Sequence, residues 1–381
     1  MSKMQLDQTD AERMHYAQQG DLAAEVDSLA RPLVQKGETP GIVVGVLLPD
    51  GQMQFFGYGV RDRAGHSQPD GDTLFAVGSL SKGFVGALTT LLVRDGTLSW
   101  DDTLGTLLPD RPLSADAKKI TLLQLATHTS GLPNQPITPK TFRYFVQYLF
   151  TGKNFYRHFD VSYVFHYLST YKAPKGNKVE YSSLGYALLS DVLEERTHVP
   201  IETLLQQNLC RPLGLGRTSY QPETLPGYAE RARGYAGDEP RFVRRGKPVP
   251  DWHFPEFMKG AAAAYSNARD LLVYASAHVR GDSDPLHAAL ADTLKVRRAQ
   301  PEKAPAIAWF VDTVDGRSIT YQIGIVAGYT SYLGIDVERK TAVVVLENSF
   351  NWTNSVGHRL LIRLSQSRAS TDPVSYNTRG R

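Results

Sequence analysis

The chain has 381 residues, of which 41% are hydrophobic and 21% are charged, and its formal net charge is +3. This composition is typical of a globular protein, and the length favours one large domain or two interlocked ones. The small net charge and the scattered Lys and Arg residues argue against nucleic acid or an anionic membrane as a partner.

The single cysteine, Cys210, excludes an intramolecular disulfide and fits a reducing compartment. Residues 1–10 are polar, and no later apolar stretch is long enough to span a bilayer. We therefore expect a cytoplasmic protein without a membrane anchor. The histidines lack metal-ligand spacing, and no phosphate-binding glycine loop is present, so we expect neither a metal nor a cofactor.

The first part of the chain predicts a helix, a hairpin and a second helix. Apolar residues recur at helical spacing from Asp21 to Gln35. Two β-rich runs, residues 41–48 and 53–60, flank a Pro-Asp-Gly turn and predict a β-hairpin. A helical pattern then begins at Ser79 and runs to about Leu92.

From residue 101 to about residue 259 helical patterns dominate. Aromatic residues crowd between Phe142 and Tyr167, where they form either the wall of a substrate cleft or the core of a helical subdomain, and ordinary burial preferences favour the core for most of them. Strand patterns return at residues 307–311, 318–323, 329–333 and 341–346, before a helix at residues 354–367.

This order predicts an α+β fold with one antiparallel sheet built from both ends of the chain and flanked by helices. We expect a discontinuous sheet domain from residues 1–100 and 260–370, an inserted helical domain at 101–259, and a loose tail at 371–381.

Ser79-Leu80-Ser81-Lys82 is the leading candidate for a reactive site. A serine and a lysine three residues apart at the start of a helix lie on the same face, one turn apart. A partly buried lysine loses its proton near neutral pH and activates a serine within hydrogen-bond reach. The pattern alone is weak, because the chain repeats it at Ser169-Thr170-Tyr171-Lys172.

Two further stretches contain candidate partners for Ser79 and Lys82. Tyr181 lies just before a predicted helix, and a tyrosine near a lysine ammonium can exchange a proton with a serine oxygen. The glycines of residues 321–334 predict an edge strand whose free amides supply half of an oxyanion hole.

Together these stretches resemble the serine β-lactamase and penicillin-binding-protein superfamily, in its class C branch with the related esterases and D-amino-acid peptidases. The phrases that carry the resemblance span most of the chain: Gly78-Ser79-Leu80-Ser81-Lys82, residues 122–133 (LLQLATHTSGLP), Tyr181-Ser182-Ser183, residues 211–215 (RPLGL), residues 264–271 (AYSNARDL) and Gly328-Tyr329. The resemblance implies a cleft between a sheet flanked by helices and an all-helical domain.

The resemblance also implies roles. Ser79 is the nucleophile, Lys82 and Tyr181 share the proton transfers, and the backbone amides of Ser79 and Ile325 hold the oxyanion. The resemblance further implies that His128 belongs to a structural turn. Ser183, Gln322, Gly324 and Tyr329 fall at positions that contact substrate in the family.

Two of these positions depart from the family's pattern. Ser183 stands where the second motif usually has asparagine, and Gln322-Ile323-Gly324 replaces a third motif that usually begins with lysine or histidine. A neutral glutamine cannot pair with a substrate carboxylate as lysine does.

We therefore expect a small-molecule ester or neutral amide as the substrate, with weak or no turnover of β-lactams. The alternatives are an intracellular acyltransferase that tailors or offloads a metabolite, a D-alanyl-D-alanine carboxypeptidase or β-lactamase, and a catalytically weak binding module. The sequence leaves the oligomeric state open.

Overall fold

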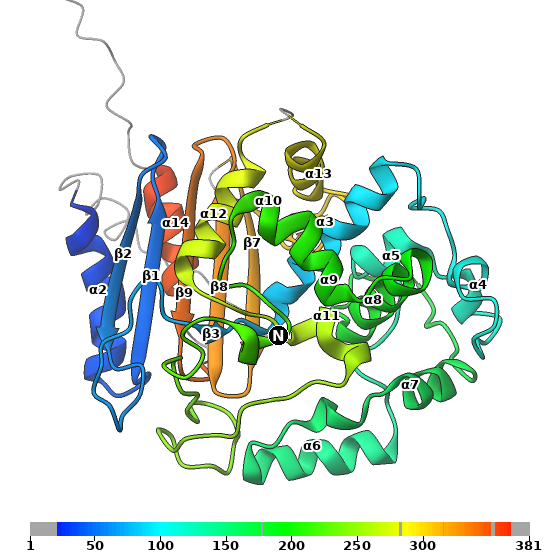
Figure 1. The fold of residues 1–381 in the computed structure, drawn as a ribbon, viewed down its shortest axis with the longest axis horizontal. Coiled ribbons are helices and arrows are strands. Elements are labelled where there is room, and N and C mark those ends of the chain that lie inside the picture. Colours follow the sequence, from blue (N-terminus) through cyan, green and yellow to red (C-terminus); the bar gives the residue numbers. More distant parts are fainter. Residues whose placement is uncertain (1–20, 177, 282–283, 315, 352–354, 367–381) are drawn as a thin grey trace, which may run out of the picture.

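The computed structural model describes residues 21–176, 178–281, 284–314, 316–351 and 355–366. The tail predicted at 371–381 lies outside these ranges. A seven-stranded sheet with the order β2-β1-β9-β8-β7-β6-β5 joins residues near both ends of the described chain (Figure 1). All of its neighbouring strands run antiparallel. The predicted α+β fold, with one sheet assembled from both parts of the chain, is confirmed.

The strands of this sheet are short and closely follow the apolar runs of the sequence. They are β1 (Gly41–Leu47), β2 (Met53–Gly59), β5 (Ala304–Pro305), β6 (Phe310–Val314), β7 (Arg317–Val326), β8 (Tyr329–Asp336) and β9 (Thr341–Glu347), and a separate two-stranded sheet pairs β3 (Phe75–Ala76) with β4 (Tyr265–Ser266).

Helices cover both faces of the sheet and fill the middle of the chain. They are α2 (Leu22–Gln35), α3 (Ser81–Arg94), α4 (Leu104–Leu107), α5 (Leu122–Ala126), α6 (Pro139–Thr151), α7 (Val161–Leu168), α8 (Ser183–Thr197), α9 (Ile201–Leu205), α10 (Arg211–Leu213), α11 (Lys259–Ala262), α12 (Ala268–His278), α13 (Pro285–Thr293) and α14 (Val356–Gln366). Figure 1 shows the sheet on the left and α4 to α9 on the right. The exact bounds of a separate helical domain stay a prediction.

The alternation of side chains along β1 separates two hydrophobic cores. Ile42, Val44 and Val46 face α2 and α14, whereas Val43 and Leu47 belong to the larger core with α3 and α12. Because successive strand residues point to opposite faces, an unbroken apolar strand such as β1 fits a sheet covered on both sides.

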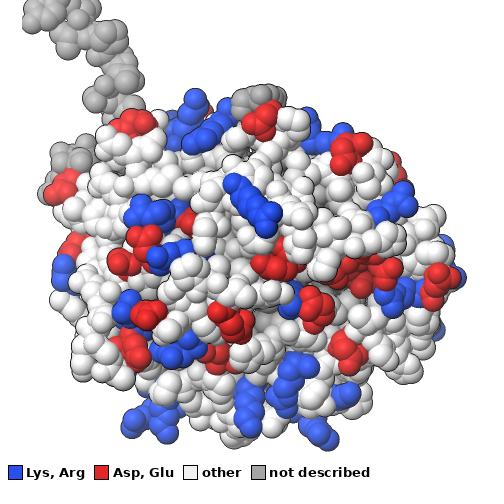
Figure 2. All heavy atoms as spheres, viewed as in Figure 1, with Lys and Arg blue, Asp and Glu red and all other residues white. Residues whose placement is uncertain are grey.

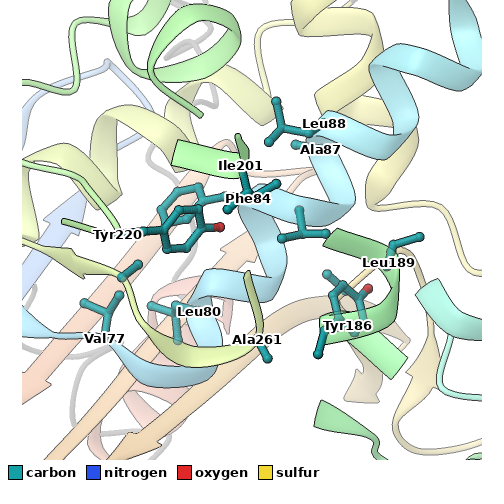
Figure 3. Packing of buried hydrophobic residues seen from close by; sticks show 14 of the residues in the cluster. Val77, Leu80, Phe84, Ala87, Leu88, Tyr186, Leu189, Ile201, Tyr220 and Ala261 are labelled. Carbon is teal, nitrogen blue, oxygen red and sulfur yellow. The ribbon is translucent and has the colours of Figure 1, made fainter. Parts of the chain in front are cut away.

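Helix α3 runs through the larger core. Figure 3 shows Leu80, Phe84 and Leu88, from the start of α3 and the turn before it, close to Tyr220 and to Ile201 of α9. Phe84 is only 1% exposed and its ring lies 4.9 Å from the Tyr274 ring of α12. This packing fixes the helix that carries the Ser-x-x-Lys motif.

The structure corrects some predicted boundaries. The strand predicted at 307–311 begins only at Phe310, and the strand predicted at 318–323 continues to Val326. β7 is not an edge strand, since β6 pairs with it as far as Tyr321. From Gln322 onward, however, β7 pairs with β8 alone, so this part of the strand has one free side.

On the face shown in Figure 2, acidic and basic side chains are interspersed over most of the surface. Within the described residues, no helix is both long and apolar enough to cross a membrane. Nor do His, Cys, Asp and Glu residues gather there in a group of three or more suited to a metal ion.

Two glycines bring the segment before Ser79 into close contact with β7. A Cβ on Gly324 would lie 2.0 Å from the Val77 carbonyl oxygen, and a Cβ on Gly78 would lie 3.0 Å from the backbone nitrogen of Ile325. Gly78 also has a φ of +53°, which L residues rarely adopt. Ser331 of β8 donates a hydrogen bond from Oγ to the same Val77 carbonyl at 2.8 Å.

We predict that Gly324→Ala separates β7 from the Val77 segment and destabilises the fold by about 1–3 kcal/mol, as overpacking does. The measurement is urea unfolding followed by circular dichroism. Gly216→Ala is the matched control, because a Cβ there meets nothing within 4 Å. Equal stabilities of the two variants would contradict the close contact.

Candidate active site

Ser79 and Lys82 lie at the start of α3. A 3₁₀ turn, η1 (Gly78–Leu80), carries Ser79 and leads directly into α3, whose second residue is Lys82. The Lys82 amine nitrogen, Nζ, lies 3.0 Å from Ser79 Oγ and donates a hydrogen bond to the Ala261 carbonyl at 2.7 Å. The helical spacing therefore produces the contact that the motif predicted.

Lys82 is only 2% exposed, and this burial lowers the pKa of its amine to about 7. Burial acts in this direction because it removes the water that stabilises the ammonium form. Near neutral pH a large fraction of the amine is therefore neutral and able to accept the Ser79 proton.

Tyr181 lies beside this pair. Its hydroxyl is buried and has no hydrogen-bond partner among the described residues, and Lys82 Nζ lies 4.9 Å from the centre of its ring. Burial raises the Tyr181 pKa, and the nearby Ser79 hydroxyl opposes that rise only in part. These opposite pKa shifts fit Lys82 as the base and Tyr181 as the proton donor, and those roles stay predictions.

His128 packs behind Tyr181, with 4.6 Å between the ring centres. Its Nδ1 accepts a hydrogen bond from the Ser182 amide at 3.1 Å, and burial together with the charge of Lys82 lowers its pKa to about 3. The imidazole is therefore neutral and supports the tyrosine. This agrees with the structural role that the resemblance implied.

Asn134 fixes the first turn of α8, which follows Tyr181. Its side-chain oxygen accepts a hydrogen bond from the Ser183 amide at 3.0 Å, and its carbonyl accepts one from the Leu184 amide at 3.1 Å. Ser182 caps the same turn through the Gly185 amide at 2.9 Å. Sequence reasoning missed Asn134, although it lies directly after the Leu132-Pro133 end of a recognised phrase.

Two cavities reach Ser79 and share Tyr181, Ile323 and Ile325 in their walls. The aromatic cavity, of about 340 Å³, is also lined by Asn134, Gln135, Phe145, Tyr148, Phe155, Tyr156, Ser183, Glu239, Trp252, Val326 and Phe350. The polar cavity, of about 380 Å³, is also lined by Lys82, Val179, Gln300, Glu302, Lys303, Ala308, Phe310, Tyr321, Gln322, Thr330 and Asn351.

The crowded aromatic segment therefore has two roles. Phe145, Tyr148, Phe155 and Tyr156 line the aromatic cavity, and all of these except Phe145 also belong to the larger core, together with Phe159 and Phe165. Trp252 comes from a distant part of the chain and joins the cavity wall, with its ring centre 5.6 Å from that of Phe155. The segment therefore contributes both to the wall of a cavity and to the core, and neither interpretation excludes the other.

Of the residues predicted to contact substrate, the structure places Ser183 in the aromatic cavity and Gln322 in the polar cavity. Gln322 is only 4% exposed and packs against α3, where a Cβ on Gly83 would lie 2.6 Å from its Nε2. That nitrogen has no hydrogen-bond partner among the described residues.

Gly324 and Tyr329 do not line either cavity. Gly324 faces the Val77 carbonyl, as described above. Tyr329 is 1% exposed and donates a hydrogen bond from its hydroxyl to the Ala232 carbonyl at 2.9 Å. Both residues therefore serve the packing around β7, and their contact with a substrate stays a prediction.

Ile325 lies on the part of β7 that has one free side, and it borders both cavities beside Ser79. This position is compatible with its amide serving the oxyanion hole, and that role stays a prediction.

A family model described as "Beta-lactamase" matches residues 26–367. The chain belongs to the β-lactamase family. The predicted class C resemblance is confirmed by solved structures with the same fold. A β-lactamase/D-alanine carboxypeptidase from Pseudomonas syringae has a TM-score of 0.75 at 22% identity, covering 92% of this chain and 99% of that one. A class C β-lactamase from Rhodobacter sphaeroides has a TM-score of 0.72 at 22% identity, covering 90% and 98%.

Curated members of the family are also similar in sequence. An unguisins hydrolase from Aspergillus campestris is 25% identical over 372 residues, which cover 91% of this chain and 65% of that protein. A β-lactamase from Pseudomonas fluorescens is 31% identical, covering 60% and 57%, and the Escherichia coli D-alanyl-D-alanine-carboxypeptidase/endopeptidase AmpH is 29% identical, covering 46% and 44%. The chain thus spans about half to two thirds of the length of these relatives.

We predict that the rate at which Ser79 reacts with a fluorophosphonate falls about tenfold for each pH unit below 7 and levels off above 7. The sign follows from the lowered Lys82 pKa, since protonation below about 7 removes the base. Lys82→Arg, which stays charged, should lower the rate at least a thousandfold, because it removes the base at every accessible pH. Lys172→Arg, in the chance repeat of the motif, is the control. A flat profile from pH 5 to 9 would exclude Lys82 as the base.

We also predict that Asn134→Ala costs about 1–3 kcal/mol of stability, because it leaves the buried Ser183 amide without an acceptor. Asn134→Asp keeps an acceptor oxygen and should recover most of this loss. Urea unfolding followed by circular dichroism measures both variants against the wild type. If Asn134→Asp is as unstable as Asn134→Ala, the side chain does not anchor α8.

Proposed function

We propose that this protein is a serine hydrolase that forms a covalent acyl-enzyme at Ser79. The observation that carries the proposal is the 3.0 Å contact between Ser79 Oγ and the buried Lys82 amine, at the point where two cavities meet. A serine, a base with a pKa near 7 and a buried proton donor are the groups that acyl transfer needs.

The mechanism uses each group once in each half-reaction. Lys82 accepts the Ser79 proton as Oγ attacks the acyl carbon. The backbone amides of Ser79 and Ile325 stabilise the oxyanion, and each such donor typically raises the rate about 10²–10³-fold. Tyr181 donates its proton to the leaving oxygen or nitrogen and recovers one from the Lys82 ammonium. Water then attacks the ester at Ser79 with the same groups in reverse.

For the substrate we propose an ester or a neutral amide, with weak or no β-lactam turnover. Gln322 is neutral and packed against α3, so its side chain offers no charge to a substrate carboxylate. The unguisins hydrolase, which aligns over 91% of this chain, supports a metabolite hydrolase. The relatives described as β-lactamases and as AmpH support carboxypeptidase or β-lactamase activity as the alternative.

The test of the acyl-enzyme is intact-mass spectrometry after incubation with a fluorophosphonate. We expect one label on the wild type and none on Ser79→Ala. Ser169→Ala is the matched control, since Ser169 begins the same four-residue pattern but donates its hydroxyl to the His166 carbonyl at 2.7 Å, and it should label normally. Equal labelling of wild type and Ser79→Ala would refute the proposal.

A substrate panel then separates the enzyme classes. We expect p-nitrophenyl butyrate to be hydrolysed faster than nitrocefin or a D-alanyl-D-alanine peptide. Rapid nitrocefin turnover would favour the β-lactamase alternative over the argument from Gln322. Product that forms only when an alcohol or amine acceptor is added would identify an acyltransferase.

A further inference from the structure

The aromatic cavity has walls of a specific kind. Tyr148, Phe155 and Trp252 surround one another, with 5.6 Å between each pair of ring centres. Tyr156 continues the wall with its ring centre 4.1 Å from that of Phe155. The face of an aromatic ring carries partial negative charge, so a cation that lies over a ring face in this cavity is attracted to it.

Glu239 adds a full negative charge to this cavity. It is the one charged side chain among the described residues that line it. Its carboxylate oxygen Oε2 is buried and has no hydrogen-bond partner among the described residues. Glu239 and Tyr148 line the same cavity, and the charge of Glu239 adds to burial in raising the pKa of the Tyr148 hydroxyl.

Among the residues that the structure describes, no Lys or Arg lines this cavity. Arg245 pairs with Asp238, and Arg157 donates to Gln147 at 2.6 Å. Arg241, whose charge and backbone amide act on Glu239, is not among the lining residues. Glu239 therefore has Arg241 as a cationic neighbour outside the cavity wall, and no cationic side chain of the described residues meets it from the cavity side.

Given the proposed hydrolase function, we propose that the aromatic cavity binds a cationic group of the substrate, an alkylammonium or a guanidinium. The ring faces of Tyr148 and Trp252 and the carboxylate of Glu239 then recognise the same charge, while the scissile ester or amide lies at Ser79. The proposed substrates therefore carry a positive charge at one end and an ester or neutral amide bond at the other.

The first experiment compares esters that differ only in this charge. One pair, choline butyrate and 3,3-dimethylbutyl butyrate, places the cation in the alcohol, and the other, the p-nitrophenyl esters of 6-aminohexanoate and heptanoate, places it in the acyl group. We expect kcat/KM to favour the cation about tenfold or more in at least one pair. A ratio near one in both pairs overturns the proposal.

Two variants test whether Glu239 causes the preference for the cationic ester. In Glu239→Gln the ratio of kcat/KM between the charged and the neutral ester should fall to near one. Glu230 is an exposed glutamate outside both cavities, so in Glu230→Gln this ratio should stay as in the wild type. Because each ratio is taken inside one variant, a general loss of activity does not disturb it. An unchanged ratio in Glu239→Gln would assign the preference to another part of the protein.

A binding measurement separates this inference from the hydrolase proposal. Choline should change the fluorescence of Trp252, 3,3-dimethylbutanol should not at the same concentration, and Trp252→Phe should remove the signal. If choline binds but no ester is hydrolysed, the cation site stands and the hydrolase fails. If esters are hydrolysed but choline does not bind, the cation site fails alone.

Discussion

The proposed chemistry of this protein depends on the burial of one lysine, Lys82. An ammonium group in water has a pKa far too high for it to serve as a base at neutral pH, and burial is what lowers it. Here α3 carries Lys82 into the interior, the Ala261 carbonyl receives its hydrogen bond, and the Tyr181 ring covers one side. Among the described residues, no acidic side chain acts on Lys82 to raise its pKa again. The packing of α3 therefore sets the reactivity of Ser79.

That burial ties the fold to the site. The helix that holds Lys82 is held in turn by apolar side chains from several distant segments, and the segment before Ser79 is held against β7 by two glycine contacts. The same residues that stabilise the fold thus position Ser79, the proposed nucleophile.

Much of this could be predicted from the sequence, because the informative signals are local. The apolar pattern of β1 and β2 defined the hairpin, and the helical spacing of Ser79 and Lys82 defined their contact. The parts that were missed depend on contacts between residues far apart in the chain. Asn134 anchors α8 from another loop, and Trp252 completes a wall begun by residues near 150. No local pattern marks such partners. A motif position likewise says nothing about the direction of a side chain, as the burial of Tyr329 illustrates.

The sheet order has a consequence for when the protein becomes reactive during synthesis. β1 pairs with β9, and Ser79 lies beside Ile325, so the nucleophile and β7 come from opposite ends of the described chain. Long-range pairing of this kind forms slowly and only after the intervening residues exist. A nascent chain can hold Ser79 and Lys82 on a helix long before β7 is available to support an oxyanion. An oxyanion site between Ser79 and β7 therefore cannot form before residues 317–326 have been synthesised.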